Sequence, residues 1–286
     1  MRIGIIGAEN SHTAAIAKTI NVDKLVSGVS VDYVWGETPV FARDAATKGG
    51  IPNIVKKPRE MMGKIDALIV DHRHPKYHLP AALPFVRRGI PTFIDKPFCY
   101  RSEQGKAFIA EAKKAGAPIT SFSVLPHQRT FMRFVRKIQD LGKIVAAGTS
   151  GASDLKSKYG GVFFYGIHQV DMALVAFGYN VKAAGIVKNG KGNCGQLIYD
   201  DGKIVTLDLI TAGSPGFGIR AIGEKGIESV QVKMDKVPYL TGIRTFVKMF
   251  RTGVEPIPHE HMLMPVQVLE TLERSVKSGQ IEKVVK

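Results

Sequence analysis

The sequence predicts an α/β protein in which a doubly wound parallel sheet is followed by an α+β domain with an open, mainly antiparallel sheet. Two observations lead to this fold class. Short apolar runs alternate with helical patterns through residues 1–122, which is typical of parallel sheets. Beyond residue 123, strand-like runs follow one another through tight turns. The chain of 286 residues is long enough for two domains, which we place at 1–122 and 123–286.

The first domain shows a regular strand–helix alternation. Its predicted strands are Arg2–Ile6, Val31–Trp35, Ala67–Val70, Thr92–Ile94 and Pro118–Val124. Its predicted helices are Ser11–Ile20, Pro39–Lys48, Leu79–Arg88 and Ser102–Ala115. Glycines follow three of these helices directly and favour the left-handed residue that ends a helix.

The second domain has a different pattern, with strands in series. Its predicted strands are Lys143–Gly148, Ala183–Lys188, Gly195–Tyr199, Ile204–Thr211, Gly218–Ile222 and Ile227–Lys233. Its predicted helices are Phe131–Leu141, His168–Phe177, Leu240–Thr252 and His261–Ser278. The segment Asp200-Asp201-Gly202 predicts a hairpin turn between two of the strands.

The composition excludes several classes of protein. The net charge is +15, but the basic residues are dispersed and do not interleave with aromatic residues, so we expect no nucleic-acid partner. A positive field of this kind favours anionic ligands. No apolar run approaches the roughly 18 residues that span a bilayer, so we expect a cytoplasmic protein without a membrane partner. The two cysteines, Cys99 and Cys194, fit a reducing compartment.

The turn after the first strand has the position of a phosphate-binding loop, in which backbone amides at a helix start hold a pyrophosphate. Of the Gly-x-Gly-x-x-Gly pattern it keeps the first glycine, whereas Glu9 and His12 replace the other two. The amides remain available as donors, and His12 could add another. The residues predicted to bind the cofactor here are Gly7, Ala8, Glu9, Asn10, Ser11 and His12. A fold of this type without a nucleotide stays open as the alternative.

Glu37 provides a second indication of a dinucleotide. It follows the second predicted strand, where an acidic residue accepts hydrogen bonds from ribose hydroxyl groups. No arginine follows it directly to hold a 2′-phosphate. The predicted cofactor is therefore NAD or NADP, with NAD favoured.

Lys96 is the strongest catalytic candidate. It ends an apolar strand, where loss of water makes its proton easier to remove, and Pro97 fixes the backbone directly after it. The second candidate, His168, opens a helix that carries Asp171 one turn later. Asp171 could orient His168 or only add charge to the first helical turn. The alternatives are a surface lysine and a structural histidine; we expect Lys96 and His168 to converge on one cleft.

Several motifs resemble the Gfo/Idh/MocA family of glucose–fructose oxidoreductases and inositol dehydrogenases. Asp95-Lys96-Pro97 is similar to the family's Glu-Lys-Pro, and His78 stands 18 residues before the lysine, as the family's histidine does. The segment from Gly160-Gly161 through Gly166, His168 and Asp171 resembles the family's glycine-rich motif in the second domain. The family's aspartate is Phe164 here, and Arg73-His74 replaces its Thr-Pro.

The resemblance implies a two-domain NAD(P)-dependent oxidoreductase with an N-terminal Rossmann domain, acting on a sugar, cyclitol or related polyol. It implies a homo-oligomer, a dimer or tetramer, in which the open sheet packs against another subunit. It also implies that the Lys96–Pro97 peptide is cis, and that Lys96 and His168 bind the reacting hydroxyl. The cofactor contacts then extend to Arg73, His74, His78, Asp95 and Pro97.

The substrate contacts we predict are Lys96, His127, Tyr165 and His168. Because Phe164 cannot relay a proton, Tyr165 is a candidate substitute hydroxyl. We predict no metal: His72 and His74 flank Arg73, which repels a cation, and their spacing matches no closed zinc pattern. The residues His259, Glu260 and His261 are expected at the surface.

Two other functions remain open from the sequence. One is a sugar-binding or regulatory protein that keeps the fold without hydride transfer, which Glu9, His12 and Phe164 favour. The other is a lyase or hydrolase that uses histidines and a metal. Binding of NADH or NADPH distinguishes the oxidoreductase from both.

Overall fold

A computed structural model describes residues 1–213 and 216–285 of the chain. The chain forms two compact units. Residues 1–122 and 237–262 make the first, and residues 123–236 and 263–286 make the second. The sequence analysis placed everything after residue 122 in the second domain, so the return of residues 237–262 to the first unit corrects it. Within the described residues, no helix combines the length and apolar character that a membrane crossing needs.

The first unit is built on a six-stranded sheet of order β3-β2-β1-β4-β5-β6, in which all pairs are parallel. Its strands are β1 (Arg2–Ile6), β2 (Ser30–Trp35), β3 (Asn53–Ile54), β4 (Ala67–Val70), β5 (Thr92–Ile94) and β6 (Ile119–Thr120). This order confirms the predicted doubly wound parallel sheet. The sequence did not predict β3, because two exposed residues carry no apolar pattern. β6 is shorter than predicted.

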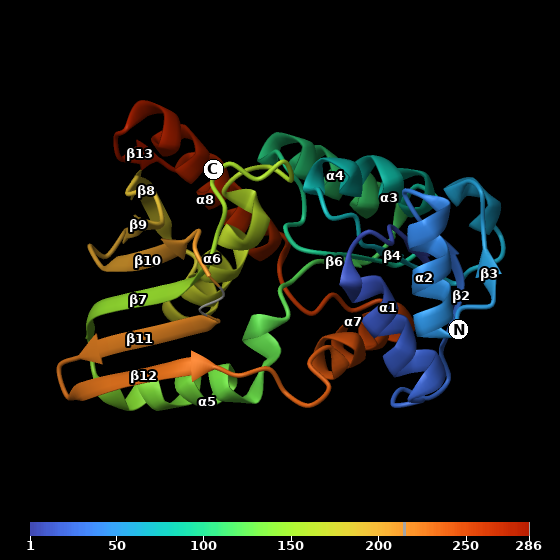
Figure 1. Cartoon of the computed structure of the whole chain (residues 1–286), viewed down its shortest axis with the longest axis horizontal. Coiled ribbons are helices and arrows are strands. Elements are labelled where there is room, and N and C mark those ends of the chain that lie inside the picture. Colours follow the sequence, from blue (N-terminus) through green and yellow to red (C-terminus); the bar gives the residue numbers. More distant parts are fainter. Residues whose placement is uncertain (214–215, 286) are drawn as a thin grey trace. The chain divides into compact units, whose positions relative to one another are not determined.

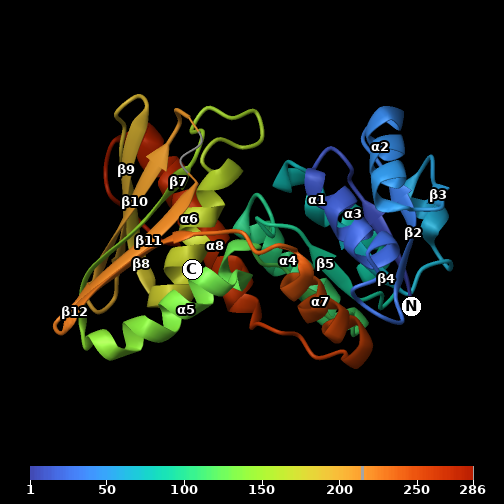
Figure 2. The ribbon, with the colours of Figure 1, turned by 60° about the horizontal axis from the view of Figure 1, so that its bottom comes forward.

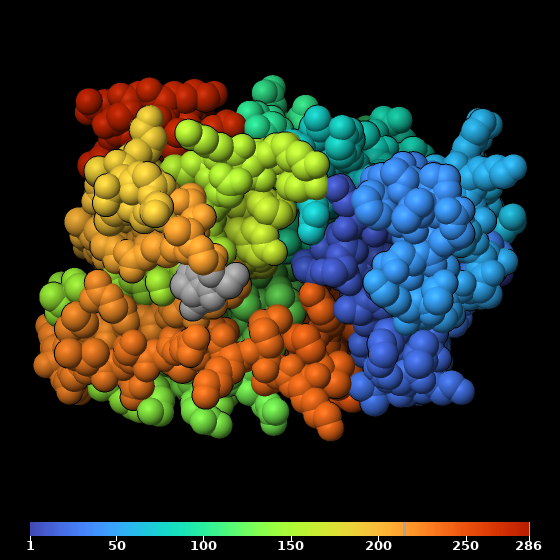
Figure 3. Space-filling model, viewed as in Figure 1, coloured from blue at the N-terminus to red at the C-terminus, as the bar shows by residue number. Residues whose placement is uncertain are grey.

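The helices of this unit connect the strands. They are α1 (Ser11–Ala17), α2 (Pro39–Gly49), α3 (His78–Val86), α4 (Ser102–Ala115) and α7 (Leu240–Thr252), with a π-helical segment Lys18–Val22 after α1 and 3₁₀-helices Pro58–Met61 and Pro75–Tyr77. Thr38 caps α2 by accepting from the amide of Phe41, and Gly50 ends it in the left-handed conformation. α1 and α2 form one continuous surface in blue in Figure 3. Only glycine fits at Gly49, since a Cβ there would lie 2.6 Å from Cβ of Ala17.

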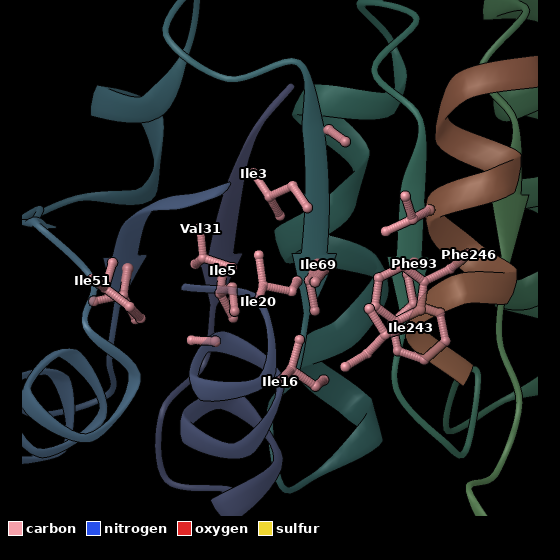
Figure 4. Packing of buried hydrophobic residues seen from close by; sticks show 14 of the residues in the cluster. Ile3, Ile5, Ile16, Ile20, Val31, Ile51, Ile69, Phe93, Ile243 and Phe246 are labelled. Carbon is pink, nitrogen blue, oxygen red and sulfur yellow. The ribbon is translucent and has the colours of Figure 1, made fainter. Parts of the chain in front are cut away.

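Helix α7 joins the first unit because it carries an apolar face. Ile243, Phe246, Val247 and Phe250 are buried there together with the core of the parallel sheet. Figure 4 shows Ile243 and Phe246 beside Phe93 of β5. The rings of Phe93 and Phe246 stack with centroids 4.6 Å apart. Burial of such a side chain stabilises a fold by roughly 1.5–3 kcal/mol, which explains why the chain returns to this core.

The second unit contains a seven-stranded sheet of order β12-β11-β7-β10-β9-β8-β13. Its strands are β7 (Ile144–Ala152), β8 (Val181–Val187), β9 (Gly192–Tyr199), β10 (Ile204–Ile210), β11 (Phe217–Gly223), β12 (Gly226–Val232) and β13 (Glu282–Lys283). The predicted turn at Asp200-Asp201-Gly202 connects the antiparallel pair β9 and β10. Because β7 and β10 are the only parallel pair among the described strands of this sheet, the predicted, mainly antiparallel sheet is confirmed.

Helices cover one face of this second sheet. They are α5 (Arg129–Lys137), α6 (Phe163–Phe177) and the part of α8 (His259–Ser278) that belongs to the unit, with 3₁₀-helices Leu125–His127 and Ile138–Leu141. Figure 2 shows α6 against β7 and β10, and the opposite face carries no helix among the described residues. The sheet is thus open, as predicted. α6 begins before the predicted His168 and includes a kink at Phe164 and Tyr165.

Candidate functional site

The carboxyl ends of β1, β4 and β5 bring three segments of the first unit together. The amide of Asp71 donates to the carbonyl of Ile6 at 2.8 Å, and the amide of Asp95 donates to the carbonyl of Val70 at 2.8 Å. The loop after β1, Asp71 after β4 and Asp95 after β5 therefore lie next to one another. In open α/β sheets, ligands bind at this end of the strands.

Gly7 shapes the loop after β1. Its φ is +106°, which side chains rarely adopt, and a Cβ would lie 2.6 Å from the backbone carbon of Asp71. The hydroxyl of Thr13 lies 2.8 Å from the carbonyl of Gly7. The retained first glycine is therefore required by the close approach of the loop to β4.

The loop amides hold an anionic group. The amides of Ala8 and Glu9 each donate to Oε2 of Glu37 at 2.9 Å, and Nδ1 of His72 lies 2.8 Å from Oε1. Burial alone would raise the pKa of Glu37, but the hydrogen bonds from His72 and the amides lower it to about 2. Glu37 is therefore ionised at neutral pH, and the donors that the sequence predicted are aimed at a negative charge.

Two buried acids lie beside this loop. The side-chain amide of Asn10 bridges them, donating at 2.9 Å to Asp71 and at 3.2 Å to Asp95. Burial and the neighbouring Asp95 raise the pKa of Asp71 well above its usual range. Burial also disfavours the charged form of Asp95, but Lys96 and His12 outweigh it and hold the pKa of Asp95 below its usual range. The pKa values of the two acids are thus shifted in opposite directions.

The hydrogen bonds of Thr13 agree with a neutral Asp71. The Thr13 hydroxyl has one proton, yet it lies 2.8 Å from the Gly7 carbonyl and 2.5 Å from Oδ2 of Asp71. If the hydroxyl donates to Gly7, a protonated Asp71 donates to the hydroxyl, and both contacts become hydrogen bonds. In that arrangement Asp71 adds no second buried negative charge beside the loop after β1.

Lys96 and His12 both lie next to the Asp95 carboxylate. Nζ of Lys96 is 3.6 Å from Oδ2 of Asp95, and Nδ1 of His12 is 3.3 Å from Oδ1. The side chains of Lys96 and His12 are 16% and 15% exposed. The imidazole packs against the ring of Tyr239, with centroids 5.1 Å apart. The Lys96–Pro97 peptide is cis, as the resemblance implies.

A cation could be held by His12, Asp71 and Asp95, whose ligand atoms lie within 4.8 Å of one another. However, the Lys96 ammonium already balances the charge of Asp95, and the Asn10 amide donates to both carboxyl groups. We therefore assign no metal to this cluster, and the predicted absence of a metal stays a prediction.

His78 connects the loops that follow β4 and β5. Its ring nitrogens lie 2.9 Å from the carbonyl of Pro97 and 2.7 Å from the carbonyl of His72, and the side chain is fully buried. Burial lowers the pKa of His78 to about 4, so at neutral pH only one of these nitrogens carries a proton. We assign His78 to positioning the Lys96–Pro97 turn, and its predicted contact with the cofactor stays a prediction.

Arg73 and His74 extend this edge of the unit. The ring of His74 packs edge-on against Tyr100, with centroids 5.0 Å apart, and its Nδ1 accepts from the amide of Lys76. Burial, then Lys76 and Arg101, lower the pKa of His74 to about 4. His74 is therefore neutral at pH 7, and Arg73 is the charged donor of the pair. Their contact with a cofactor stays a prediction.

In the second unit, His168 lies on α6. Its Nδ1 is 2.8 Å from Oγ of Ser123, and its ring packs edge-on against Phe217 with centroids 5.2 Å apart. The neighbouring Gln169 is fully buried and donates to the carbonyl of Ala152, which ties α6 to the end of β7. These contacts fix the orientation of the imidazole.

Tyr165 is in a strained conformation beside His168. Its φ of 64° and ψ of −30° are unusual for a bulky residue and cost of order 1–3 kcal/mol. The side chain is 41% exposed, and its ring centroid lies 5.7 Å from that of His168. Phe164 packs against Tyr165 at 4.6 Å and against Tyr159 at 5.0 Å. Strain of this kind clusters at functional sites, which agrees with the predicted role of Tyr165.

The remaining predicted site residues of this unit are Asp171 and His127. Asp171 is buried on α6. Burial and then the charge of Asp171 raise the pKa of Tyr179. His127 ends a 3₁₀-helix, and burial lowers its pKa to about 4. Both roles stay predictions.

Sequence reasoning missed several contributors to these clusters. Asp71 could have been recognised, because it follows β4 as Asp95 follows the adjacent β5. Thr13, Ser123, Phe217 and Tyr239 gave no comparable indication, since their partners are distant in sequence.

The comparisons with known proteins place this geometry in a class. Residues 1–122 match the family model GFO_IDH_MocA, described as "Oxidoreductase family, NAD-binding Rossmann fold". Residues 1–122 are similar to the NAD-binding Rossmann domain of this oxidoreductase family. Among curated protein sequences, none matches the chain.

Solved structures share the fold over the whole chain. A probable dehydrogenase from Thermotoga maritima has a TM-score of 0.84 at 18% identity, covering 99% of both chains. Scyllo-inositol dehydrogenase from Lactobacillus casei, solved with NAD(H) and scyllo-inositol, has a TM-score of 0.86 at 14% identity, covering 100% of this chain and 99% of its own. Myo-inositol 2-dehydrogenase from Lactobacillus plantarum has a TM-score of 0.87 at 14% identity, with the same coverage.

The residues present fit a nicotinamide dinucleotide. The loop keeps the close approach at Gly7, and its amides already bind the oxygens of a carboxylate. Substitution of the second and third glycines leaves these donors intact, because backbone groups make the contact. With a nucleotide bound, the amides of Ala8 and Glu9 would exchange Oε2 of Glu37 for phosphate oxygens, and Glu37 would accept from ribose hydroxyl groups.

Proposed function

We propose that the protein is an NAD-dependent dehydrogenase or reductase that acts on a sugar, cyclitol or related polyol. The observation that carries this proposal is the position of Lys96 at the end of β5, paired with Asp95 beside a loop whose amides bind an anion. The inositol dehydrogenases that share the fold support this substrate class.

Lys96 is the proposed acid/base group. Oxidation of an alcohol requires removal of the hydroxyl proton, and an amine positioned by the Pro97 turn can take it. In the opposite direction the ammonium polarises the carbonyl and returns the proton. When bound, the nicotinamide supplies the hydride chemistry. Lys96, Asp95 and the loop then fix the geometry of the proton transfer.

His168 and Tyr165 are the proposed substrate contacts of the second unit. Ser123 and Phe217 hold the imidazole, and the strained backbone holds the tyrosine ring beside it. An imidazole and a phenol are both suited to hydrogen bonds with polyol hydroxyl groups. This pair replaces the acidic residue of the family motif, where Phe164 has no polar atom.

Glu37 favours NAD over NADP, because an ionised carboxylate repels a 2′-phosphate. Replacing it with serine (Glu37→Ser) is expected to weaken NADH binding by roughly ten- to a hundredfold, as loss of a hydrogen bond to a charged group costs about 1.5–3 kcal/mol. NADPH binding is expected to weaken less, so that the preference for NADH over NADPH becomes smaller. Fluorescence titration with both nucleotides measures each dissociation constant.

Asp44→Ser is the matched control for this experiment. It removes the same charge from the first unit, but Asp44 pairs with Lys48 on the exposed face of α2. Unequal weakening at Glu37 and no change at Asp44 support the assignment. Equal loss of NADH and NADPH affinity in the Glu37 variant would mean that this carboxylate does not discriminate the cofactors.

We also propose that the protein forms a homo-oligomer through the helix-free face of the second sheet. Ile204 and Ile227, at the ends of β10 and β12, are 44% and 68% exposed. Sedimentation equilibrium is expected to give a dimer or tetramer, and a monomer at all concentrations would contradict the proposal.

A further inference from the structure

A series of ionisable groups in the first unit connects Lys96 to His12 through Asp95. Nζ of Lys96 lies 3.6 Å from Oδ2 of Asp95, which lies 3.3 Å from Nδ1 of His12. A substrate hydroxyl bonded to Lys96 occupies the ammonium face that water otherwise reaches. A proton taken from substrate then needs a second route to solvent, and the partly exposed His12 lies at the end of one.

Neighbouring side chains hold Lys96, Asp95 and His12 in place. Asn10 donates to both Asp71 and Asp95, and thereby fixes the carboxylate between the two basic groups. Four side chains face the imidazole: Asn10, Asp95, Tyr239, and Asp71 at 3.9 Å. Asp95 lies closer to the imidazole than Asp71 does, at 3.3 Å, so Asp95 is the carboxylate that exchanges a proton with His12.

His12 occupies a position that the phosphate-binding motif reserves for glycine. A glycine there would leave Asp95 without an imidazole. In addition, Phe164 stands where the family's motif in the second domain has an aspartate, and its side chain cannot carry a proton. The chain has thus lost one ionisable group and gained another beside Asp95.

We propose that Asp95 and His12 form a proton relay between Lys96 and water. This rests on the proposed function. The Lys96 ammonium that pairs with Asp95 at rest passes a proton to the Asp95 carboxylate, the resulting carboxyl gives it to Nδ1 of His12, and the imidazolium releases its Nε2 proton to water, with which the imidazole then exchanges protons to regain its starting tautomer. The hydroxyl O–H bond breaks as the Lys96 amine takes the proton, which restores the ammonium. One proton leaves for each hydroxyl oxidised, so all three groups return to their starting charge.

Chemical rescue tests the relay. His12→Gly is expected to lower NAD-dependent oxidation of the best polyol among the inositols and hexoses by about tenfold or more. Added imidazole is expected to restore the rate saturably, because it can fill the space and carry the proton. His259→Gln is the control: His259 pairs with Glu255 elsewhere in the unit, and imidazole should leave this variant unchanged.

The outcomes separate the relay from the proposed function. If the wild-type protein turns over a polyol but His12→Gly is unimpaired, or is impaired without rescue, the relay is wrong and the proposed function stands. If His12→Gly loses NADH binding in a fluorescence titration and imidazole does not rescue turnover, His12 belongs to the cofactor loop alone. If the wild-type protein oxidises no polyol, the proposed function falls, and the relay falls with it.

A second measurement needs no substrate. In the full chain labelled with ¹⁵N-histidine, Asp95→Asn is expected to shift the ring-nitrogen resonances of His12 in the NMR spectrum and to leave those of His259 in place. Unchanged His12 resonances would show that its imidazole does not share a proton with Asp95, and would overturn the relay.

Discussion

Replacing Lys96 with methionine (Lys96→Met) is expected to lower polyol oxidation by roughly a hundred- to ten-thousandfold, the usual contribution of a positioned acid/base group. Methionine keeps the length of the side chain but has no amine to take the hydroxyl proton. NADH binding, measured by fluorescence titration, is expected to persist, because the loop amides and Glu37 are unchanged. Steady-state rates with NAD and the best available polyol measure the effect.

Lys96→Arg is the matched variant, because a guanidinium keeps the ion pair with Asp95 but does not give up its proton. It is expected to be as inactive as Lys96→Met yet more stable. Since Lys96 lowers the pKa of Asp95, the stabilisation from this pair is present at neutral pH and is lost as the pH falls through the folded-state pKa. The stability gap between the two variants should therefore narrow in acid. Full activity in either variant would remove Lys96 from the mechanism.

Gly7→Ala is expected to lower the free energy of unfolding by about 2–5 kcal/mol and to abolish NADH binding at micromolar protein. The new Cβ would lie 2.6 Å from the backbone carbon of Asp71 and 2.7 Å from the amide nitrogen of His72, neither of which can move cheaply. Alanine is also strained at a φ of +106°. Urea denaturation measures the stability, and fluorescence titration measures the binding.

Gly63→Ala is the control for Gly7. Gly63 has a φ of +73°, but a Cβ there would meet no atom within 4 Å. The free energy of unfolding of this variant is expected to fall only by the cost of the left-handed conformation, about 1–2 kcal/mol. The variant is expected to bind NADH normally. If both glycine variants were equally stable, the close approach between the β1 loop and β4 would be ruled out.

The sequence predicts the parallel sheet well because its information is local. Short apolar strands, glycines that end helices and the Lys96–Pro97 step each depend on neighbouring residues. Asp71 was within reach by the same logic, since acidic residues that end adjacent parallel strands must meet. The π-helical end of α1 and the short length of β6 could not be predicted, because no residue there marks them.

Contacts between residues far apart in the sequence explain the features that the sequence does not predict. The apolar face of α7 predicts burial, but not that Phe246 returns to Phe93 in the first unit. The pair of Ser123 and His168 joins residues 45 positions apart. Tyr165 has a positive φ that its own chemistry opposes, so the surrounding fold must impose it. These features arise from packing and cannot be read from any single segment.

Equilibrium titration of the full chain with NADH, followed by nicotinamide fluorescence, tests the central claim most directly. The account predicts saturable binding that NAD competes away, that Glu37→Ser weakens and that Lys96→Met leaves nearly unchanged. Absence of saturable binding by the folded wild-type protein would contradict it, since the anion-binding loop of the first unit would then serve no dinucleotide.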